Sequence, residues 1–391
     1  MYKSCIITHR QGFWAYDTLL ACPKLDFFGF HDTANLFSSG VNPYQLEPAE
    51  DFDIIFIGSH PLRYLVPNGK EKEVIKALEK KCKKLVLIDG WDSFDLSVPP
   101  SIVDLFETVL KVNGVYKDKD LYNWKVGCDY PGVNWTNKET KKNHIYTHEQ
   151  LDKIKLSFPC QVGIVPEVKR RLRKHNPTLG YWTTQSRNIV DQMFKQASVL
   201  MKYRFANQLT SFLGDLGHIQ RLELLHLLHD NHIDGDYGVF RVLESMAGLE
   251  QSLCPEQVKK HKEELEAHKL LKKKKNRIQY LYDFSKFKSI ISPVGYGEMC
   301  FRDLEIMQMG RCGIKQDISH VDHLAPFVPN ENIIFCKPNF SDLVEILHNV
   351  DRREIDYKQI GKNAYKAARS WEQNIDQVLE TSIITPLFPH A

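Results

Sequence analysis

Short runs of apolar residues alternate along this chain with longer segments in which apolar residues recur at helical spacing. Runs of the first kind predict buried strands at residues 5–8, 53–57, 85–88, 208–213, 287–291, 312–316 and 332–335. Segments of the second kind predict helices at residues 71–84, 222–228, 254–279, 299–309, 342–350 and 357–382. Because strands and helices alternate, we expect parallel α/β sheets in two doubly wound halves.

One connection between two predicted strands contains the most informative polar pattern. Gly295 and Gly297 follow the first of these strands, and an apolar helix comes after them. Glu298, Arg302 and Glu305 stand at helical spacing, so a helix through all three would present them on one face. The connection therefore combines a glycine turn, a helix N-terminus and one polar helix face.

These residue types suit the binding of a nucleoside diphosphate. The N-terminus of the helix offers backbone N–H groups and the positive end of the helix dipole to a phosphate. Arg302 can donate two hydrogen bonds to the same phosphate, and Glu305 can accept hydrogen bonds from the two hydroxyls of a ribose. An ordinary buried helix with a Glu298–Arg302 ion pair fits the same spacing, which leaves both interpretations open.

The same connection resembles the donor-binding signature of GT-B glycosyltransferases. It is most similar to the exostosin-like pattern and to bacterial and viral members with an S-P-x-G-x-G-E-x-C-x-R-D-x-E block. The resemblance rests on the run Gly297-x-x-Cys300-x-Arg302-x-x-Glu305, with Gly310 following and Asp317 after the next strand. Many retaining members separate two glutamates by one residue more than Glu298 and Glu305, so the stereochemical class does not carry over.

The resemblance implies an α/β fold in which two Rossmann-like domains face a cleft. Residues 1–180 would form the acceptor-side domain and residues 181–370 the domain that binds the nucleotide-sugar donor. Residues 371–391 would contain a C-terminal helix that crosses back and packs on the N-terminal domain.

The resemblance also implies site residues from both domains. The donor-binding set is Gly214, Arg221, Gly295, Gly297, Glu298, Arg302, Glu305, Asp317 and His320. A catalytic base would come from the N-terminal domain, and we rank the candidates His60, Asp92 and Asp32 by their positions at predicted strand ends and loops. Sites of this kind use no metal, so we expect neither a metal nor a cofactor beyond the nucleotide-diphosphate sugar.

Acidic and histidine pairs elsewhere suggest competing interpretations. Asp234 and Asp236 have the D-x-D spacing with which GT-A glycosyltransferases hold a divalent cation, although such pairs are common in turns. His226, His229 and His232 follow one another at a spacing that differs from the usual helical zinc pair, and we assign no metal to them. A non-catalytic protein that binds a nucleotide sugar is a further alternative.

Composition narrows the class of protein. The 391 residues have a net charge of only +3, and the basic runs at residues 169–174 and 272–275 lack interleaved aromatic residues, which argues against nucleic-acid binding. Nine cysteines without paired spacings, and no apolar run long enough for a signal peptide or a membrane span, predict a cytoplasmic protein. The expected partners are a nucleotide-sugar donor and a glycan or glycolipid acceptor. The lysine block would allow peripheral contact with an anionic membrane.

Overall fold

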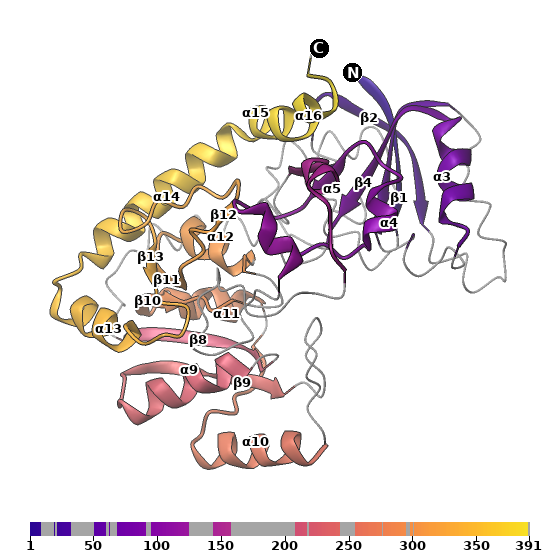
Figure 1. Cartoon of the computed structure of the whole chain (residues 1–391). Coiled ribbons are helices and arrows are strands. Elements are labelled where there is room, and N and C mark those ends of the chain that lie inside the picture. The colour runs from indigo at the N-terminus through magenta and orange to yellow at the C-terminus, as the bar shows by residue number, and fades with distance from the viewer. Residues whose placement is uncertain are drawn as a thin grey trace.

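In the computed structural model, two parallel β-sheets with flanking helices occupy the two halves of the chain (Figure 1). The structure describes residues 1–8, 19, 22–32, 51–59, 62, 69–90, 95–124, 144–157, 208–216, 219–242, 255–275, 277–294, 298–299 and 301–389. The predicted boundary between residues 180 and 181 lies outside these ranges and stays a prediction.

The first sheet belongs to the N-terminal half, and all of its strands are parallel. In spatial order they are β2 (Leu25–Asp32), β1 (Tyr2–Thr8), β3 (Phe52–Gly58), β4 (Cys82–Asp89), β5 (Val109–Lys111) and β7 (Ile154–Leu156). Strand β3 is buried over most of its length because the sheet is covered on both faces. Such a strand is a continuous apolar run, and the sequence pattern therefore predicts β3 to within one residue at each end.

The second sheet belongs to the C-terminal half and is also parallel throughout. In spatial order its strands are β13 (Ile334–Cys336), β11 (Cys312–Gln316), β10 (Phe287–Ile291), β8 (Gln208–Leu216) and β9 (Gly235–Val242). The predicted bounds of β10 and β11 are confirmed. The pattern does not predict the edge strand β9, because Gly238 and Arg241 interrupt its apolar residues.

Both sheets have the same topology. Numbered along the chain within each sheet, the strand order is 2-1-3-4-5, and the first sheet adds a sixth strand at the end. The order reverses between β1 and β3 in the first sheet and between β8 and β10 in the second. Ligands of parallel α/β sheets bind outside the carboxyl ends of the strands at such a reversal point. The topology therefore directs attention to the ends of β8 and β10.

Helices connect and cover the strands (Figure 1). Those of the first half are α3 (Glu71–Glu79), α4 (Pro100–Val103), the 3-10 helix Lys119–Asn123 and α5 (His148–Asp152). Those after β8 are α9 (Ile219–Asp230), α10 (Pro255–Ala267), α11 (Arg277–Phe284), α12 (Phe301–Gln308), α13 (Leu343–Arg352), α14 (Tyr357–Gln373), α15 (Ile375–Leu379), the π-helical turn Glu380–Ile384 and α16 (Thr385–Leu387).

The single helix predicted at residues 254–279 is wrong, because the chain there forms the separate helices α10 and α11. Lys269 adopts a left-handed conformation with a φ of 58°, and the Leu270 N–H bonds to the Leu265 carbonyl, which closes the end of α10. Both leucines are buried. The lysine block at residues 272–275 therefore lies between two helices, beside β9, and not on a helix.

Two other predicted helices are too long. Helix α3 ends at Glu79 because Cys82 and Lys84 already pair with β3 as part of β4. The final helix predicted at residues 357–382 is divided into α14, α15 and a π-helical turn.

A small antiparallel sheet joins the two halves. Its strands β6 (Val115–Tyr116) and β12 (Val321–Asp322) come from opposite halves of the chain. Beside it, the backbone N–H of Lys117 donates to the His320 carbonyl at 3.1 Å, and the Lys117 ammonium donates to the Ser319 carbonyl at 2.7 Å. The ends of β5 and β11 are thus connected by main-chain hydrogen bonds.

The C-terminal segment crosses back over the first half, as predicted (Figure 1). Its apolar side chains share a buried cluster with the first sheet: Trp371, Ile375, Leu379, Ile383, Ile384 and Leu387. The Tyr2 and Phe388 rings stack with their centroids 4.3 Å apart, which brings the two ends of the chain together.

Candidate functional site

The carboxyl end of β8 lies at the reversal point of the second sheet. Strand β8 pairs with β9 on one side and β10 on the other, and its register with β9 shifts between Gly214 and Asp215. A register shift of this kind twists a strand locally and re-aims the residues around it. Gly214, a predicted donor-binding residue, therefore stands at an irregular position where the topology predicts a ligand.

Arg221 comes from α9, the helix that follows β8, but it contacts the chain that follows β10. Its Nε and Nη2 atoms donate to the Val294 carbonyl at 3.2 and 3.0 Å. The Val294 N–H in turn donates to Oε1 of Gln316 at 2.9 Å. The backbone N–H and the backbone carbonyl of Val294 are thus both hydrogen-bonded.

Arg302 makes the reverse connection. It comes from α12, the helix after β10, and its Nη2 atom donates to the Leu213 carbonyl near the end of β8 at 2.8 Å. Its Nε atom donates to the Tyr280 hydroxyl at 3.0 Å. Arg221 and Arg302 therefore cross-connect the two strand ends that define the reversal point.

Both guanidinium groups lie over one aromatic ring. The central carbons of Arg221 and Arg302 are 5.9 and 5.5 Å from the centroid of the buried Phe212 ring. A Cβ atom on Gly214 would stand 3.2 Å from Arg302 Nη2 and 3.5 Å from Arg221 Nη1, so both groups come close to the same glycine. Two guanidinium charges that are never deprotonated, both close to one glycine, are suited to hold a diphosphate.

Buried polar side chains connect the elements around Arg221 and Arg302. Gln316 is fully buried, and its amide nitrogen donates to the Gln220 side chain at 3.1 Å and to the Pro338 carbonyl at 2.8 Å. Together with its bond to Val294, it ties α9, the turn after β10 and the chain after β13 to the end of β11. Gln316 is not among the predicted site residues, although a polar residue at the end of an apolar strand is a signal for such a role.

A buried ion pair makes a further connection of this kind. Lys315 on β11 and Asp303 on α12 are both buried and 2.9 Å apart, and Ser292 Oγ donates to the other carboxylate oxygen of Asp303 at 2.5 Å. A buried charge is stable only when it is paired and hydrogen-bonded. The three residues fix the turn after β10 against α12 and β11. Lys315 and Asp303 are not among the predicted site residues either, and the lysine inside an apolar strand is the signal that could have found this pair.

The predicted polar face of the helix at 299–309 is shorter than expected. Helix α12 begins at Phe301, so Glu298 precedes the helix, and the face contains Arg302 and Glu305 alone. The prediction of one face with three members is wrong, because the residues after β10 are hydrogen-bonded to β11 and α9 before the helix starts. Glu298 and Glu305 are both buried, with exposed fractions of 2% and 3%.

The other two donor-binding candidates of the C-terminal half follow β11. Asp317 Oδ1 accepts a hydrogen bond from the Ser319 N–H at 2.8 Å and so shapes the loop. His320 packs on the Tyr116 ring of the first half, with centroids 6.0 Å apart. Burial lowers the pKa of His320 to about 4, against the opposing effect of Asp317 and with a smaller contribution from Lys117. His320 therefore lies at the contact between the halves.

The candidates for the base are only partly described. His60 and Asp92 lie outside the described residues, as do the donor-loop glycines Gly295 and Gly297. Asp32 is the last residue of β2, at the carboxyl edge of the first sheet. The assignment of a base among these three stays a prediction.

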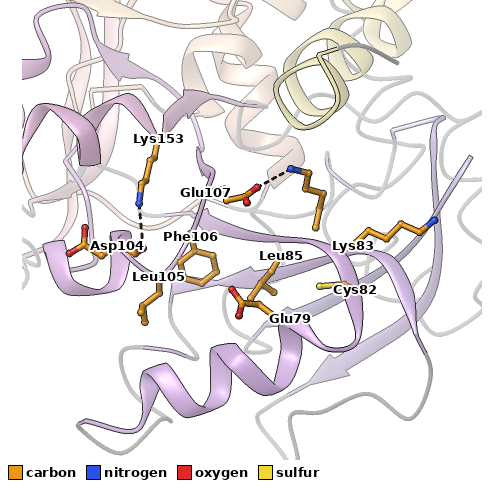
Figure 2. Close-up of a pocket in the computed structure, with 10 residues that line it drawn as sticks. Glu79, Cys82, Lys83, Leu85, Asp104, Leu105, Phe106, Glu107 and Lys153 are labelled. Atoms are coloured by element: carbon orange, nitrogen blue, oxygen red, sulfur yellow. Dashed lines mark hydrogen bonds and ion pairs between the residues drawn. The ribbon is translucent and has the colours of Figure 1, made fainter.

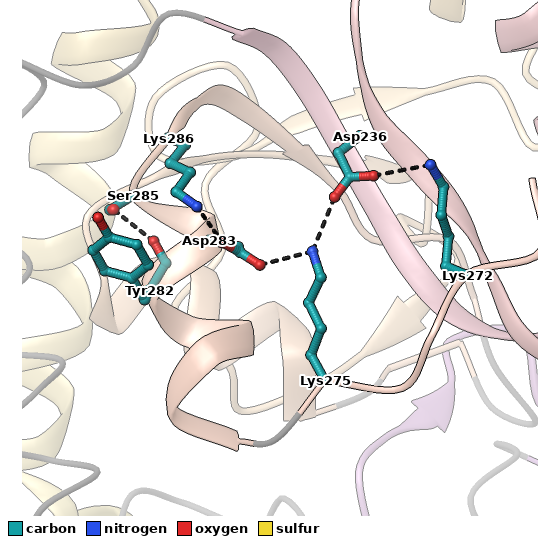
Figure 3. Close-up of polar contacts among 7 residues, drawn as sticks. All are labelled: Asp236, Lys272, Lys275, Tyr282, Asp283, Ser285 and Lys286. Carbon is teal, nitrogen blue, oxygen red and sulfur yellow. Dashed lines mark hydrogen bonds and ion pairs between the residues drawn. The ribbon is translucent and has the colours of Figure 1, made fainter.

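The D-x-D candidate Asp236 belongs to an ion network (Figure 3). Its carboxylate lies 3.2 Å from the Lys272 ammonium and 2.9 Å from the Lys275 ammonium, and Lys275 also contacts Asp283 at 2.7 Å. Burial raises the pKa of Asp236, but the hydrogen bonds and charges of the two lysines outweigh this effect and lower it. Lys273 and Lys274 are the members of the lysine block that stay exposed.

The helical histidines form contacts with α10. His229 Nε2 lies 2.9 Å from His268 Nδ1, and His226 Nε2 lies 3.5 Å from a carboxylate oxygen of Glu264. His232 follows α9 with a φ of 52°. Among the described residues, no group of three or more histidine, cysteine or acidic side chains is arranged to hold a metal.

A cavity of about 380 Å³ lies on the first sheet (Figure 2). It is lined by the first residues of β4 and by residues that precede β4 and β5, among them Glu79 and Phe106, at the amino ends of these strands. Ionic contacts such as the 2.9 Å Lys84–Glu107 pair partly span it. The cavity therefore lies at the edge of the sheet opposite to the one where ligands of such folds bind.

In the described part of the chain, no helix is both long and apolar enough to cross a bilayer.

No family model matches this chain, and no curated protein matches it in sequence. The solved structures that are similar to it include two that match over nearly the whole length of both chains. HepE from Anabaena, in complex with UDP, has a TM-score of 0.50 at 11% identity, and the match covers 98% of this chain and 100% of HepE. A glycosyltransferase from Rickettsia africae has a TM-score of 0.50 at 12% identity, with 100% and 99% covered. The likeness shows the fold: the predicted α/β architecture of two Rossmann-like domains, of GT-B type, is confirmed.

Proposed function

We propose that this protein is a glycosyltransferase that moves a sugar from a nucleotide-diphosphate sugar to a hydroxyl of a glycan or glycolipid acceptor. The observation that carries the proposal is the pair of Arg221 and Arg302 beside Gly214, at the reversal point of the second sheet. The fold supports it, because one similar structure contains UDP and the other is a glycosyltransferase. The sequence resemblance to a donor-binding signature concerns the same strand-to-helix connection.

Sugar transfer breaks the bond between the anomeric carbon and a diphosphate oxygen, and a bond from the acceptor oxygen replaces it. Negative charge develops on the leaving diphosphate, and fixed positive groups stabilise that charge. Arg221 and Arg302 would supply this stabilisation, and Glu305 would orient the ribose. The acceptor proton would pass to a base of the first half, for which His60, Asp92 and Asp32 are the candidates.

We further propose that the reaction needs no metal. Two arginines at the diphosphate position supply the positive charge that a divalent cation supplies in D-x-D enzymes. Asp236 supports this view, because its carboxylate is already held by two lysines.

Differential scanning fluorimetry with UDP, GDP and ADP, each with EDTA or with Mn²⁺, tests the proposal. A ligand at 100 times its Kd stabilises the folded state by about 2.7 kcal/mol, so the melting temperature rises. We expect one nucleoside diphosphate to stabilise the protein equally in EDTA and in Mn²⁺. In Arg302→Ala its Kd should increase at least about tenfold, because a hydrogen bond to a charged group contributes about 1.5–3 kcal/mol.

The matched control is Arg352→Ala, which removes an exposed arginine whose partner is Glu354 on the surface. It should leave the shift unchanged. Stabilisation that requires Mn²⁺ and is lost in Asp234→Ala would favour the D-x-D interpretation. No shift with any of the nucleotides would refute the proposed function.

A further inference from the structure

The guanidinium group of Arg302 is held from two sides. Its Nη2 atom donates to the main-chain carbonyl of Leu213 at 2.8 Å, and its Nε atom donates to the Tyr280 hydroxyl at 3.0 Å. A guanidinium is planar, and its five N–H groups point in fixed directions. Two contacts on different nitrogens therefore define the plane of the group above Phe212 and the directions in which its other N–H bonds point.

The position of Tyr280 is itself fixed by packing and ionic contacts. It lies on α11, and its ring packs on Phe284 with centroids 4.5 Å apart, against a buried cluster that contains residues of β10 and α12. The same helix is tied to β9 by the chain of contacts from Asp283 through Lys275 to Asp236 (Figure 3). The hydroxyl that contacts Arg302 therefore belongs to helix α11, and not to either of the two strands at the reversal point.

We propose that Tyr280 is a positioning residue for the diphosphate site: its hydroxyl orients Arg302 toward the phosphates and does not itself touch the donor. This inference rests on the proposed function, because it assigns Arg302 to a nucleoside diphosphate. Side chains that support a binding residue in this way fix its geometry before the ligand arrives, which lowers the entropy cost of binding. The contribution of Tyr280 therefore depends on Arg302 being present.

The test is Tyr280→Phe, which removes one oxygen atom and keeps the ring on Phe284. Isothermal titration with UDP and with inorganic pyrophosphate should show that Kd rises for both, by up to about tenfold, because ordering a flexible side chain on binding costs about 0.5–1.5 kcal/mol. Binding of uridine, which has no phosphate, should be unchanged. A merely structural role of the hydroxyl would affect the three probes alike.

The same helix offers a matched control. Tyr282→Phe is the same substitution two residues away, on a side chain that is 48% exposed and lies beside Lys286. It should leave all three affinities unchanged. In the Arg302→Ala background, Tyr280→Phe should cause no further loss of pyrophosphate or UDP affinity, because the two residues act as one unit.

The outcomes separate this inference from the function on which it rests. If the wild-type protein binds UDP and pyrophosphate and Tyr280→Phe binds them equally well, the positioning role is wrong and the proposed function stands. An equal loss for uridine, or an additive loss in the double variant, also overturns the positioning role. If the wild-type protein binds none of UDP, GDP, ADP and pyrophosphate, both proposals fail.

Discussion

At the scale of single residues, the site depends on hydrogen bonds that two arginines make across the reversal point of the second sheet. Arg221 follows β8 in the chain but bonds to the main chain after β10, and Arg302 follows β10 but bonds to the main chain of β8. Each arginine therefore stabilises the strand end next to its own. Gly214 is the residue that lets both guanidinium groups approach, since it has no side chain to occupy the space between them.

Gly214→Ala tests this role of the glycine. The added Cβ would stand 3.2 Å from Arg302 Nη2, so the guanidinium has to shift, and we expect the Kd for UDP to rise about tenfold. Gly313→Ala is the steric control, because its Cβ would also meet a side chain at 3.2 Å, that of Ile306 in the apolar core. The control should lower the melting temperature without changing UDP affinity. Equal affinities of Gly214→Ala and wild type would contradict the assignment.

At the scale of elements, the break between α10 and α11 decides where the lysine block lies. The left-handed Lys269 ends α10, and the extended residues after it bring Lys272 and Lys275 to Asp236 on β9. Had the helix continued through this region, the extended pairing beside β9 could not form. The break thus fixes α11, and with it Tyr280, relative to the second sheet.

Lys269→Gly should stabilise the protein by about 0.5–1 kcal/mol, because glycine adopts a left-handed conformation without the steric cost that lysine has there. Urea unfolding monitored by circular dichroism measures the difference. Lys262→Gly, an exposed position inside α10, is the comparison and should destabilise by about 1 kcal/mol. The same sign of change in both variants would show that Lys269 does not end the helix in this way.

At the scale of the whole molecule, the halves are joined by the β6–β12 pair and by the packing of His320 on Tyr116. Burial raises the pKa of the Tyr116 hydroxyl well above its ordinary value, and the charges of Asp95 and Glu298 act in the same direction. The C-terminal helices add a second attachment through the core of the first sheet.

The junction should weaken as the pH falls. The His320 pKa is about 4 in the folded state and near 6.5 in the unfolded state, so the unfolded chain binds more protons between these values. The stabilisation is fully present above pH 6.5 and is lost as the pH falls towards 4, by about 2 kcal/mol at pH 5. Urea unfolding at pH 7 and pH 5 should show a smaller loss in His320→Asn than in wild type. An identical loss of stability in both proteins would show that a group other than His320 takes up the proton.

Local pattern was sufficient for several parts of this protein. The bounds of β3, β10 and β11 follow from continuous apolar runs, because strands buried on both faces tolerate few polar residues. The pattern also identified the α/β class and placed Arg302 on a helix directly after β10. These features depend on neighbours in sequence, and one chain is enough to show them.

The tertiary structure alone decided how the polar residues meet. Arg221 and Val294 are far apart in the chain, as are Arg302 and Leu213, and each pair meets only once the parallel strands are in register. Lys315 and Asp303 lie on consecutive elements, and their contact likewise depends on how α12 packs on β11. Periodicity along a sequence shows which face of an element is buried, but it contains no information about which element covers that face. The sequence therefore determined the buried strands β3, β10 and β11 and the chemistry available, and docking of the elements determined the site.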